Sequence, residues 1–169
     1  MKQIVVFTAG DLLCAFTASA VEEILPMPRL WRHPSLPRVV EGFFRFGSTV
    51  VATLNFNLLF DIPKSRGDEG ELYQHLVLIK AREGQLIAVL VERVVDVTMA
   101  DMVAVEVTSE SESLNDCVEQ GVAYGERFVS VLNSQRLMIE TERQKLTDMT
   151  REAERRAAEW SDLPGESRP

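Results

Sequence analysis

Three stretches of the chain share one pattern, in which an apolar run, a short turn with glycine and a second apolar run follow one another. They are residues 4 to 16, 75 to 91 and 121 to 132, with turns at Gly10, Gly84 and Gly125. Each stretch predicts a β-hairpin, because β-branched and aromatic residues favour strands and glycine fits tight turns. The strands are almost continuously apolar. We therefore expect both faces to be covered, as in small closed barrels or tightly packed sheets.

Two other stretches interrupt this pattern. Residues 61 to 71 are charged and rich in turn formers, and we expect them to separate two strand-rich halves. Residues 26 to 38 contain four prolines, which exclude a regular helix or a central strand. This segment should be a structured loop, held to the body by Leu30, Trp31 and Leu36.

From residue 133 onward the apolar positions recur at steps of three and four. Asn133 or Ser134 can cap a helix that runs to Trp160 without glycine or proline. Its apolar stripe is thin and consists of Leu146, Met149, Ala153, Ala157 and Trp160. The stripe favours a helix that folds back on the sheets. The alternative is a helix that docks a partner through Leu146, Met149 and Trp160.

Composition and charge limit the classes of function. The 169 residues are 46% apolar and 26% charged, which is typical of a soluble globular protein. The net charge is −8, and residues 65 to 133 hold five Lys or Arg against thirteen Asp or Glu. This balance argues against nucleic acid as a partner and favours a basic one. Within this part, residues 108 to 119 predict an exposed acidic loop.

The sequence contains no apolar run long enough to cross a membrane and no secretory signal, so we expect a cytoplasmic protein without membrane insertion. It has no glycine-rich phosphate loop. Cys14 and Cys117 are not clustered, and His33 and His75 lack ligand or triad partners at a recognisable spacing. We therefore expect no cofactor, metal or catalytic site. Binding through surfaces remains, with a small barrel enzyme or ligand-binding protein as the alternative from another class.

The order of these features resembles the CheW-like domain family over residues 3 to 139. After the first hairpin come Val21-Glu22-Glu23-Ile24, then Leu36-Pro37, and then GFFRFGSTVVATLNF, residues 42 to 56. The last segment matches the family signature Gly-Val-Ile-Asn-Leu-Arg-Gly-x-Val-Ile-Pro-Val-Ile-Asp-Leu without a gap. The resemblance implies a mainly β fold of two packed five-stranded β-barrels, here with a long C-terminal helix. The expected division is therefore residues 1–139, a helical extension at 140–162 and a frayed tail at 163–169.

The resemblance also implies a non-catalytic adaptor that couples chemoreceptors to a CheA-type histidine kinase. Receptor helices would dock in a groove between the barrels. The candidate groove residues are Val21, Ile24, Gly42, Arg45, Phe46, Gly47 and Ser48. For Val21 and Ile24 the alternative is a role in the core. The phenylalanines at 43, 44 and 46 replace smaller aliphatic residues, and we expect at least one of them to be exposed.

This chain departs from the family signature at its polar positions. The family's Arg is Gly47 here, its Asn is Arg45, and its Gly, Pro and Asp are Ser48, Ala52 and Asn55. In an extended strand, positions 45 and 47 point to the same side about 6.6 Å apart, so Arg45 could reach part of the same region. Alternatively, Arg45 is a solvated edge residue and Gly47-Ser48 is a turn.

The missing arginine leaves two adaptor hypotheses. Losing a buried interfacial charge contact costs about 2 to 5 kcal/mol, which is enough to abolish ordinary receptor coupling. The first hypothesis is an adaptor that binds a CheA-type kinase and a chemoreceptor signalling tip. The second is a divergent adaptor that has lost receptor coupling and links the kinase to another regulatory or motility partner.

Overall fold

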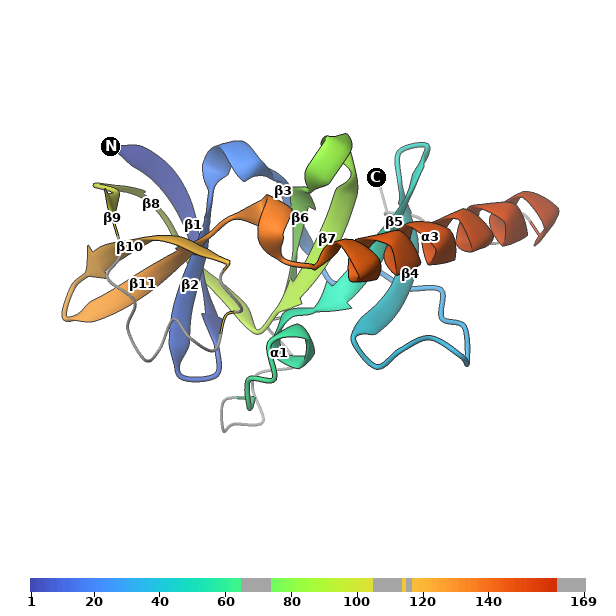
Figure 1. The fold of residues 1–169 in the computed structure, drawn as a ribbon, viewed down its shortest axis with the longest axis horizontal. Helices are drawn as coiled ribbons and strands as arrows, with labels where there is room; N and C mark the ends of the chain where they lie inside the picture. Colours follow the sequence, from blue (N-terminus) through green and yellow to red (C-terminus); the bar gives the residue numbers. More distant parts are fainter. Residues whose placement is uncertain (65–73, 105–113, 115–116, 161–169) are drawn as a thin grey trace.

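The computed structural model describes residues 1–64, 74–104, 114 and 117–160, apart from the side chains of Val103, Ala104 and Trp160. Its strands form two sheets, with a long helix beside the second (Figure 1). The six-stranded sheet has the order β8-β1-β2-β11-β10-β9, comprising Lys2–Ala9 (β1), Leu12–Thr17 (β2), Arg93–Ala100 (β8), Val103–Ala104 (β9), Val118–Tyr124 (β10) and Arg127–Leu132 (β11). The five-stranded sheet has the order β3-β6-β7-β5-β4, comprising Val21–Pro26 (β3), Val40–Phe46 (β4), Thr49–Asn55 (β5), His75–Lys80 (β6) and Leu86–Val91 (β7).

The helical elements are short except for the last. They are the α-helices Phe56–Leu59 (α1) and Glu140–Trp160 (α3) and the 3-10 turns Ala18–Ala20 (η1), Arg82–Gly84 (η3) and Ser134–Arg136 (η4). The three predicted hairpins are confirmed as β1/β2, β6/β7 and β10/β11. Their turn glycines have the positive φ that L side chains avoid, at 57° for Gly10, 72° for Gly84 and 60° for Gly125.

Alternate residues of most strands pack into different cores, so both faces of these strands are covered, as the apolar runs predict. In β7, Ile87 and Val89 point into a core shared by the two sheets, whereas Ala88 and Leu90 point into a second core within the five-stranded sheet. A third core lies within the six-stranded sheet. The shared core also contains Phe7, whose ring stacks on Phe16 and packs edge-on against Phe56.

The two sheets are rolled but are not the closed five-stranded barrels that we expected. Among the described residues, the strand order of each sheet has two free edges, and one sheet has six strands. The chain nevertheless links the edges. Only Asp101 and Met102 separate β8 from β9, and after β3 the backbone of Trp31 pairs with Phe43 of β4 through bonds of 2.8 and 2.9 Å. These short links curl each sheet around its inner core.

The expected division into two halves near residues 61–71 is wrong. Residues 65–71 of this stretch lie outside the described residues, but the strands before and after it, β5 and β6, belong to the same sheet. The chain instead changes sheets at η1 and between β7 and β8, so the six-stranded sheet is built from both ends of the sequence. Parallel pairing of β2 with β11, such as Leu13 opposite Val129, joins those ends.

The proline-rich segment is a structured loop anchored as predicted. Trp31 and Leu36 pack against the shared core, and Leu30 packs against the inner core of the five-stranded sheet. Gly42 lies directly beneath this segment, with φ at +148°, and a Cβ atom there would lie 2.5 Å from the carbonyl oxygen of Trp31. Only glycine allows the loop to cross β4 this closely.

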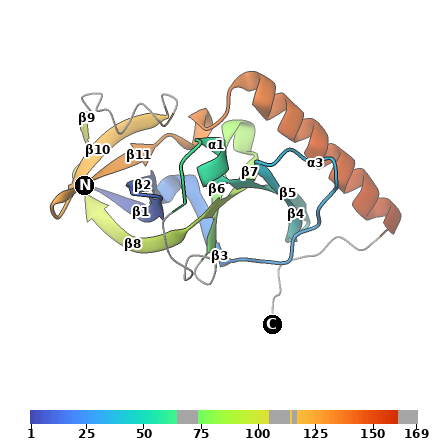
Figure 2. The same cartoon turned by 90° about the horizontal axis from the view of Figure 1, so that it is seen from below.

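Helix α3 begins at Glu140, the first residue of the expected extension, and not directly after the expected cap at residue 133 or 134. The cap that we identified is real, but it serves the 3-10 turn η4, because the Gln135 amide donates to the Asn133 side chain at 2.9 Å. Figure 2 shows α3 running along the outside of the five-stranded sheet. Leu146 and Ala153 lie in the shared core, so the helix folds back as favoured.

The predicted exposed loop at 108–119 lies mostly outside the described residues. Two of its described members, Leu114 and Cys117, are fully buried in the shared core. The Cys117 thiol donates to the Arg136 carbonyl oxygen at 2.6 Å, and the Asn133 amide donates to the Cys117 carbonyl oxygen at 2.8 Å. These positions therefore belong to the core, not to an exposed loop.

We predict that Leu146→Ala destabilises the protein by about 2 to 5 kcal/mol, because it removes buried methyl groups from the shared core and leaves a cavity. The side chain is only 2% exposed. Lys145→Ala is the matched control, since this neighbour is exposed and surface changes stay within about 0.5 kcal/mol. Urea unfolding would measure both, and equal midpoints for the two variants would show that α3 is not anchored by Leu146.

We predict that Cys14 does not react with a thiol reagent at pH 8 in the folded protein. Burial raises the pKa of the Cys14 thiol to about 12, so almost no reactive thiolate is present at that pH. The thiol should become reactive in 6 M guanidinium chloride. Mass spectrometry of alkylated peptides gives the measurement, and rapid native labelling of Cys14 would contradict this burial.

Candidate protein-docking surface

The edge strand β8 exposes a row of apolar side chains. Val95, Val97 and Met99 are 41%, 46% and 55% exposed. A β-strand sends alternate residues to one face, so these three side chains form a continuous stripe. A stripe of this kind on an edge strand is typical of a protein-binding surface.

The stripe continues the shared core toward solvent. Residues paired across an antiparallel ladder lie on the same face, and β8 pairs Val97 with Val5 and Met99 with Gln3. The register then shifts by one residue and skips Val95, so that Val94 lies opposite Phe7. Phe7 is in the shared core, and Val94 packs against it. Along this face the side chains therefore pass from core to surface, ending at Met99. A partner helix laid on the stripe would extend the packing between the two sheets.

The opposite face of β8 carries the polar residues, which reverses the usual arrangement. Asp96 and Thr98 are half-buried and alternate with the exposed apolar residues. The Tyr124 hydroxyl donates to Asp96 at 2.7 Å, and this hydrogen bond raises the pKa of Tyr124. The polar pair therefore lies inside the roll, and the apolar row lies on its outer face.

Strand β3 is an edge of the other sheet and contains the first two predicted groove residues. Val21 is half-buried and packs against the shared core, so it borders the same core as Val94. Ile24 is half-buried as well. Between them Glu22 and Glu23 are exposed, and Glu22 lies 3.6 Å from Lys80. Both predicted roles, core and groove wall, are compatible with the position of Val21.

The other predicted groove residues lie at the β4/β5 hairpin. Strand β4 ends at Phe46, and Gly47 and Ser48 form a two-residue turn, so positions 45 and 47 do not share an extended strand as we assumed. Gly47 has φ at +61°, whereas Ser48 has no positive φ. This is the pattern of a type II′ turn, which places glycine first. Gly47 and Ser48 are exposed, and Arg45 is half-buried.

The predicted set therefore separates into two places. In strand order β3 and β4 are opposite edges of the five-stranded sheet, although Leu25 and Phe44 share its inner core. Gly42 offers no docking surface, because it is buried under Trp31. Of the three signature phenylalanines, Phe43 and Phe44 are buried, and only Phe46 is partly exposed.

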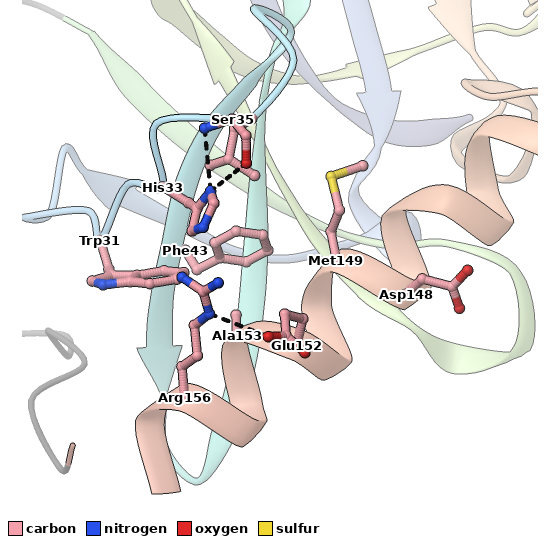
Figure 3. Close-up of a pocket in the computed structure, with 10 residues that line it drawn as sticks. Trp31, His33, Ser35, Phe43, Asp148, Met149, Glu152, Ala153 and Arg156 are labelled. Carbon is pink, nitrogen blue, oxygen red and sulfur yellow. Dashed lines mark hydrogen bonds and ion pairs between the residues drawn. The ribbon is translucent and has the colours of Figure 1, made fainter. Parts of the chain in front are cut away.

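The predicted partner-docking face of α3 is used by the protein itself. Leu146 is buried in the shared core, and Met149 is half-buried against it. The side chain of Trp160 lies outside the described part of the structure. Figure 3 shows the α3 contact with the proline-rich segment, around a cavity of about 370 Å³ that Trp31 and Phe43 line opposite Met149.

Charged side chains of α3 form contacts within the helix and with the segments beside it. Arg156 lies over the Trp31 ring at 5.9 Å and donates to Glu152 at 3.2 Å. Hydrogen bonds from Arg155 and Arg156 lower the pKa of Glu152 to about 2. Near the start of the helix, Arg82 of η3 lies 3.5 Å from Glu140. These contacts are largely exposed, so each contributes little stability.

Among the described residues, no group of three or more His, Cys, Asp or Glu side chains could hold a metal ion. His33 instead forms a local bond to the Ser35 hydroxyl at 2.6 Å. Within the same residues, no helix is long and apolar enough to span a bilayer.

Comparison with known proteins identifies the relatives of this fold. The family model of the CheW-like domain matches residues 3–142. The crystal structure of the scaffolding protein TtCheW from Thermoanaerobacter tengcongensis is similar, with a TM-score of 0.69 and 17% identity, covering 82% of this chain and 89% of that chain. No curated protein matches. At 17% identity, the solved structure supports the fold alone.

The family match spans 140 of the 169 residues, from residue 3 to residue 142, and ends where α3 begins. It includes both sheets and the β8 stripe. The chain belongs to the CheW-like domain family.

Proposed function

We propose that this protein is a non-catalytic chemosensory adaptor in the cytoplasm, which binds the CheW-like regulatory domain of a CheA-type histidine kinase and couples it to a chemoreceptor. Membership of the CheW-like family supports the adaptor role. The observation that carries the receptor contact is the apolar stripe of Val95, Val97 and Met99, which continues the shared core between the sheets.

The receptor contact would be made by the signalling tip of the receptor, a helical segment with an apolar face. Such a helix would lie along β8 and cover the stripe, with Val21 of β3 bordering the same core on the other sheet. Burying one exposed apolar side chain contributes about 1.5 to 3 kcal/mol. Association itself costs several kcal/mol, so a measurable affinity requires further contacts beside the stripe.

We predict that Met99→Glu weakens binding of a receptor signalling-tip peptide about tenfold or more, because a charge would be placed in the apolar contact. Kinase-domain binding should remain within about twofold. Isothermal titration of purified protein against the receptor peptide and the kinase regulatory domain from the same organism gives both constants.

Ile139→Glu is the control for Met99→Glu, because Ile139 is also an exposed apolar residue, at 68%, but lies away from β8. It should leave both affinities unchanged. Equal loss of receptor binding in the two variants would exclude the β8 stripe as the receptor surface.

The alternative is a divergent adaptor that has lost receptor coupling and links the kinase to a different regulatory or motility partner. The observation that favours it is Gly47, which stands where the family has arginine. No atom lies within 4 Å of a Cβ built on Gly47, so the first side-chain atom of an arginine meets open space there. Its cost is limited to the left-handed backbone, about 1 to 2 kcal/mol.

If receptor coupling has been lost through this position, Gly47→Arg should make kinase binding dependent on receptor, whereas the natural chain binds kinase regardless of receptor. Gly125→Arg is a matched control, since Gly125 has φ at +60° and equally open surroundings but lies on the other sheet. The titration of kinase with and without receptor separates the cases. A natural chain whose kinase binding is already strengthened by receptor would exclude the alternative.

A further inference from the structure

Three chain segments meet at the carboxylate of Glu92. The Gly10 backbone amide, in the β1/β2 turn, donates to Oε2 of Glu92 at 2.9 Å. The side-chain amide of Asn57, in α1, donates to Oε1 at 3.1 Å. Gly10 belongs to the six-stranded sheet, whereas α1 follows directly from β5 of the five-stranded sheet. One carboxylate therefore ties the two sheets together.

The surroundings of this contact are tightly packed. Asn57 is only 5% exposed, and its carbonyl oxygen accepts the Ile62 amide at 2.8 Å. A Cβ atom on Gly10 would lie 2.5 Å from the Pro63 carbonyl oxygen. The β1/β2 turn is thus packed closely against the chain that follows α1.

Glu92 also occupies the point where the chain changes sheets. Val91 ends β7 of the five-stranded sheet, and Arg93 begins β8 of the six-stranded sheet. The crossing is a single residue long. Its backbone sets the direction of β8, and its side chain fixes that direction against Gly10 and Asn57.

We propose that Glu92 is a positioning residue, which sets the angle between the two sheets and thereby holds the β8 stripe in place for its partner. This inference rests on the proposed receptor contact. The stripe is on the strand that Glu92 starts, and the neighbouring strand β1 ends one residue before Gly10. Strands β1 and β8 are therefore both fixed to α1 through the same carboxylate.

The length of β8 amplifies any movement at the crossing. Met99 is the seventh residue after Glu92 along the strand, a distance of about 24 Å, so a rotation of about 5° would displace Met99 by about 2 Å. A displacement of that size would break apolar contacts, which operate at about 4 Å between atoms. Loss of the Glu92 hydrogen bonds should therefore weaken receptor binding without removing any side chain of the stripe.

The test measures two quantities in the natural chain and in variants: the distance between the sheets, and the affinities for the receptor peptide and the kinase domain. Spin labels at Thr49→Cys on β5 and Ala123→Cys on β10 report on the two sheets, because both positions are exposed whereas Cys14 and Cys117 are buried. In Glu92→Ala, pulsed electron paramagnetic resonance should show a shifted or broader distribution of distances between the two spin labels. Receptor-peptide affinity should fall about tenfold, while kinase-domain affinity is retained.

Two controls separate positioning from a general loss of stability. Glu41→Gln alters a comparable carboxylate, which accepts Asn55 at 2.9 Å within the five-stranded sheet alone. Leu146→Ala weakens the shared core but leaves the hydrogen bonds of Glu92 with Gly10 and Asn57 in place. Neither should shift the distances or the receptor affinity. If Glu92→Ala fails to fold, Asn57→Ala removes the α1 partner alone and should give the same shift.

Unchanged distances in both Glu92→Ala and Asn57→Ala would show that Glu92 does not set the angle between the sheets. A shifted distance with unchanged receptor affinity would overturn its role in holding the stripe. If the natural chain binds neither receptor nor kinase, the proposed function fails. The distance measurement then still decides whether Glu92 holds the two sheets.

Discussion

The structure depends on strands whose two faces are both apolar. A strand such as β7 cannot leave either face in water, since Ile87 and Val89 on one side and Ala88 and Leu90 on the other all need cover. Each sheet meets this demand by rolling around an inner core, and the two rolls meet over the shared core. Helix α3 covers part of the same surface through Leu146 and Ala153. The β8 stripe is apolar surface left uncovered at the edge of this arrangement, which makes it the natural place for a partner.

Local features of the fold could be predicted from the sequence, whereas the pairing of distant strands could not. Gly10, Gly84 and Gly125 mark turns, because their positive φ is a local requirement that glycine meets. The pairing of Leu13 with Val129 depends on contacts across more than a hundred residues, and period-two apolarity is the same whichever strand lies alongside. For this reason the charged stretch at 61–71 could be mistaken for a boundary between sheets.

The candidate site shows the same limit. The resemblance to the family led to Val21 through its motif, and the structure places it against the shared core. The β8 stripe was missed because alternating Val95, Val97 and Met99 would ordinarily indicate a core face. Alternation reveals two faces but not which one is inside, and here the Tyr124 hydroxyl satisfies Asp96 within the roll. Gly42 was misassigned for a related reason, since the loop lying 2.5 Å from its Cβ position comes from another part of the chain.

The altered signature at Gly47 and Ser48 is best understood as a change of turn type. Gly10, Gly47 and Gly125 each stand first in a two-residue hairpin turn with a positive φ, the type II′ arrangement. The family signature has arginine first and glycine second, so its positive φ would have to fall on the second residue. When Gly-Ser replaces Arg-Gly, the glycine moves from the second to the first position of the turn, and the positive φ moves with it. The two substitutions are therefore coupled through the backbone, and the hairpin is preserved while its exposed tip loses a charge. This coupling lets the tip diverge without disturbing β4, β5 or the shared core beneath them.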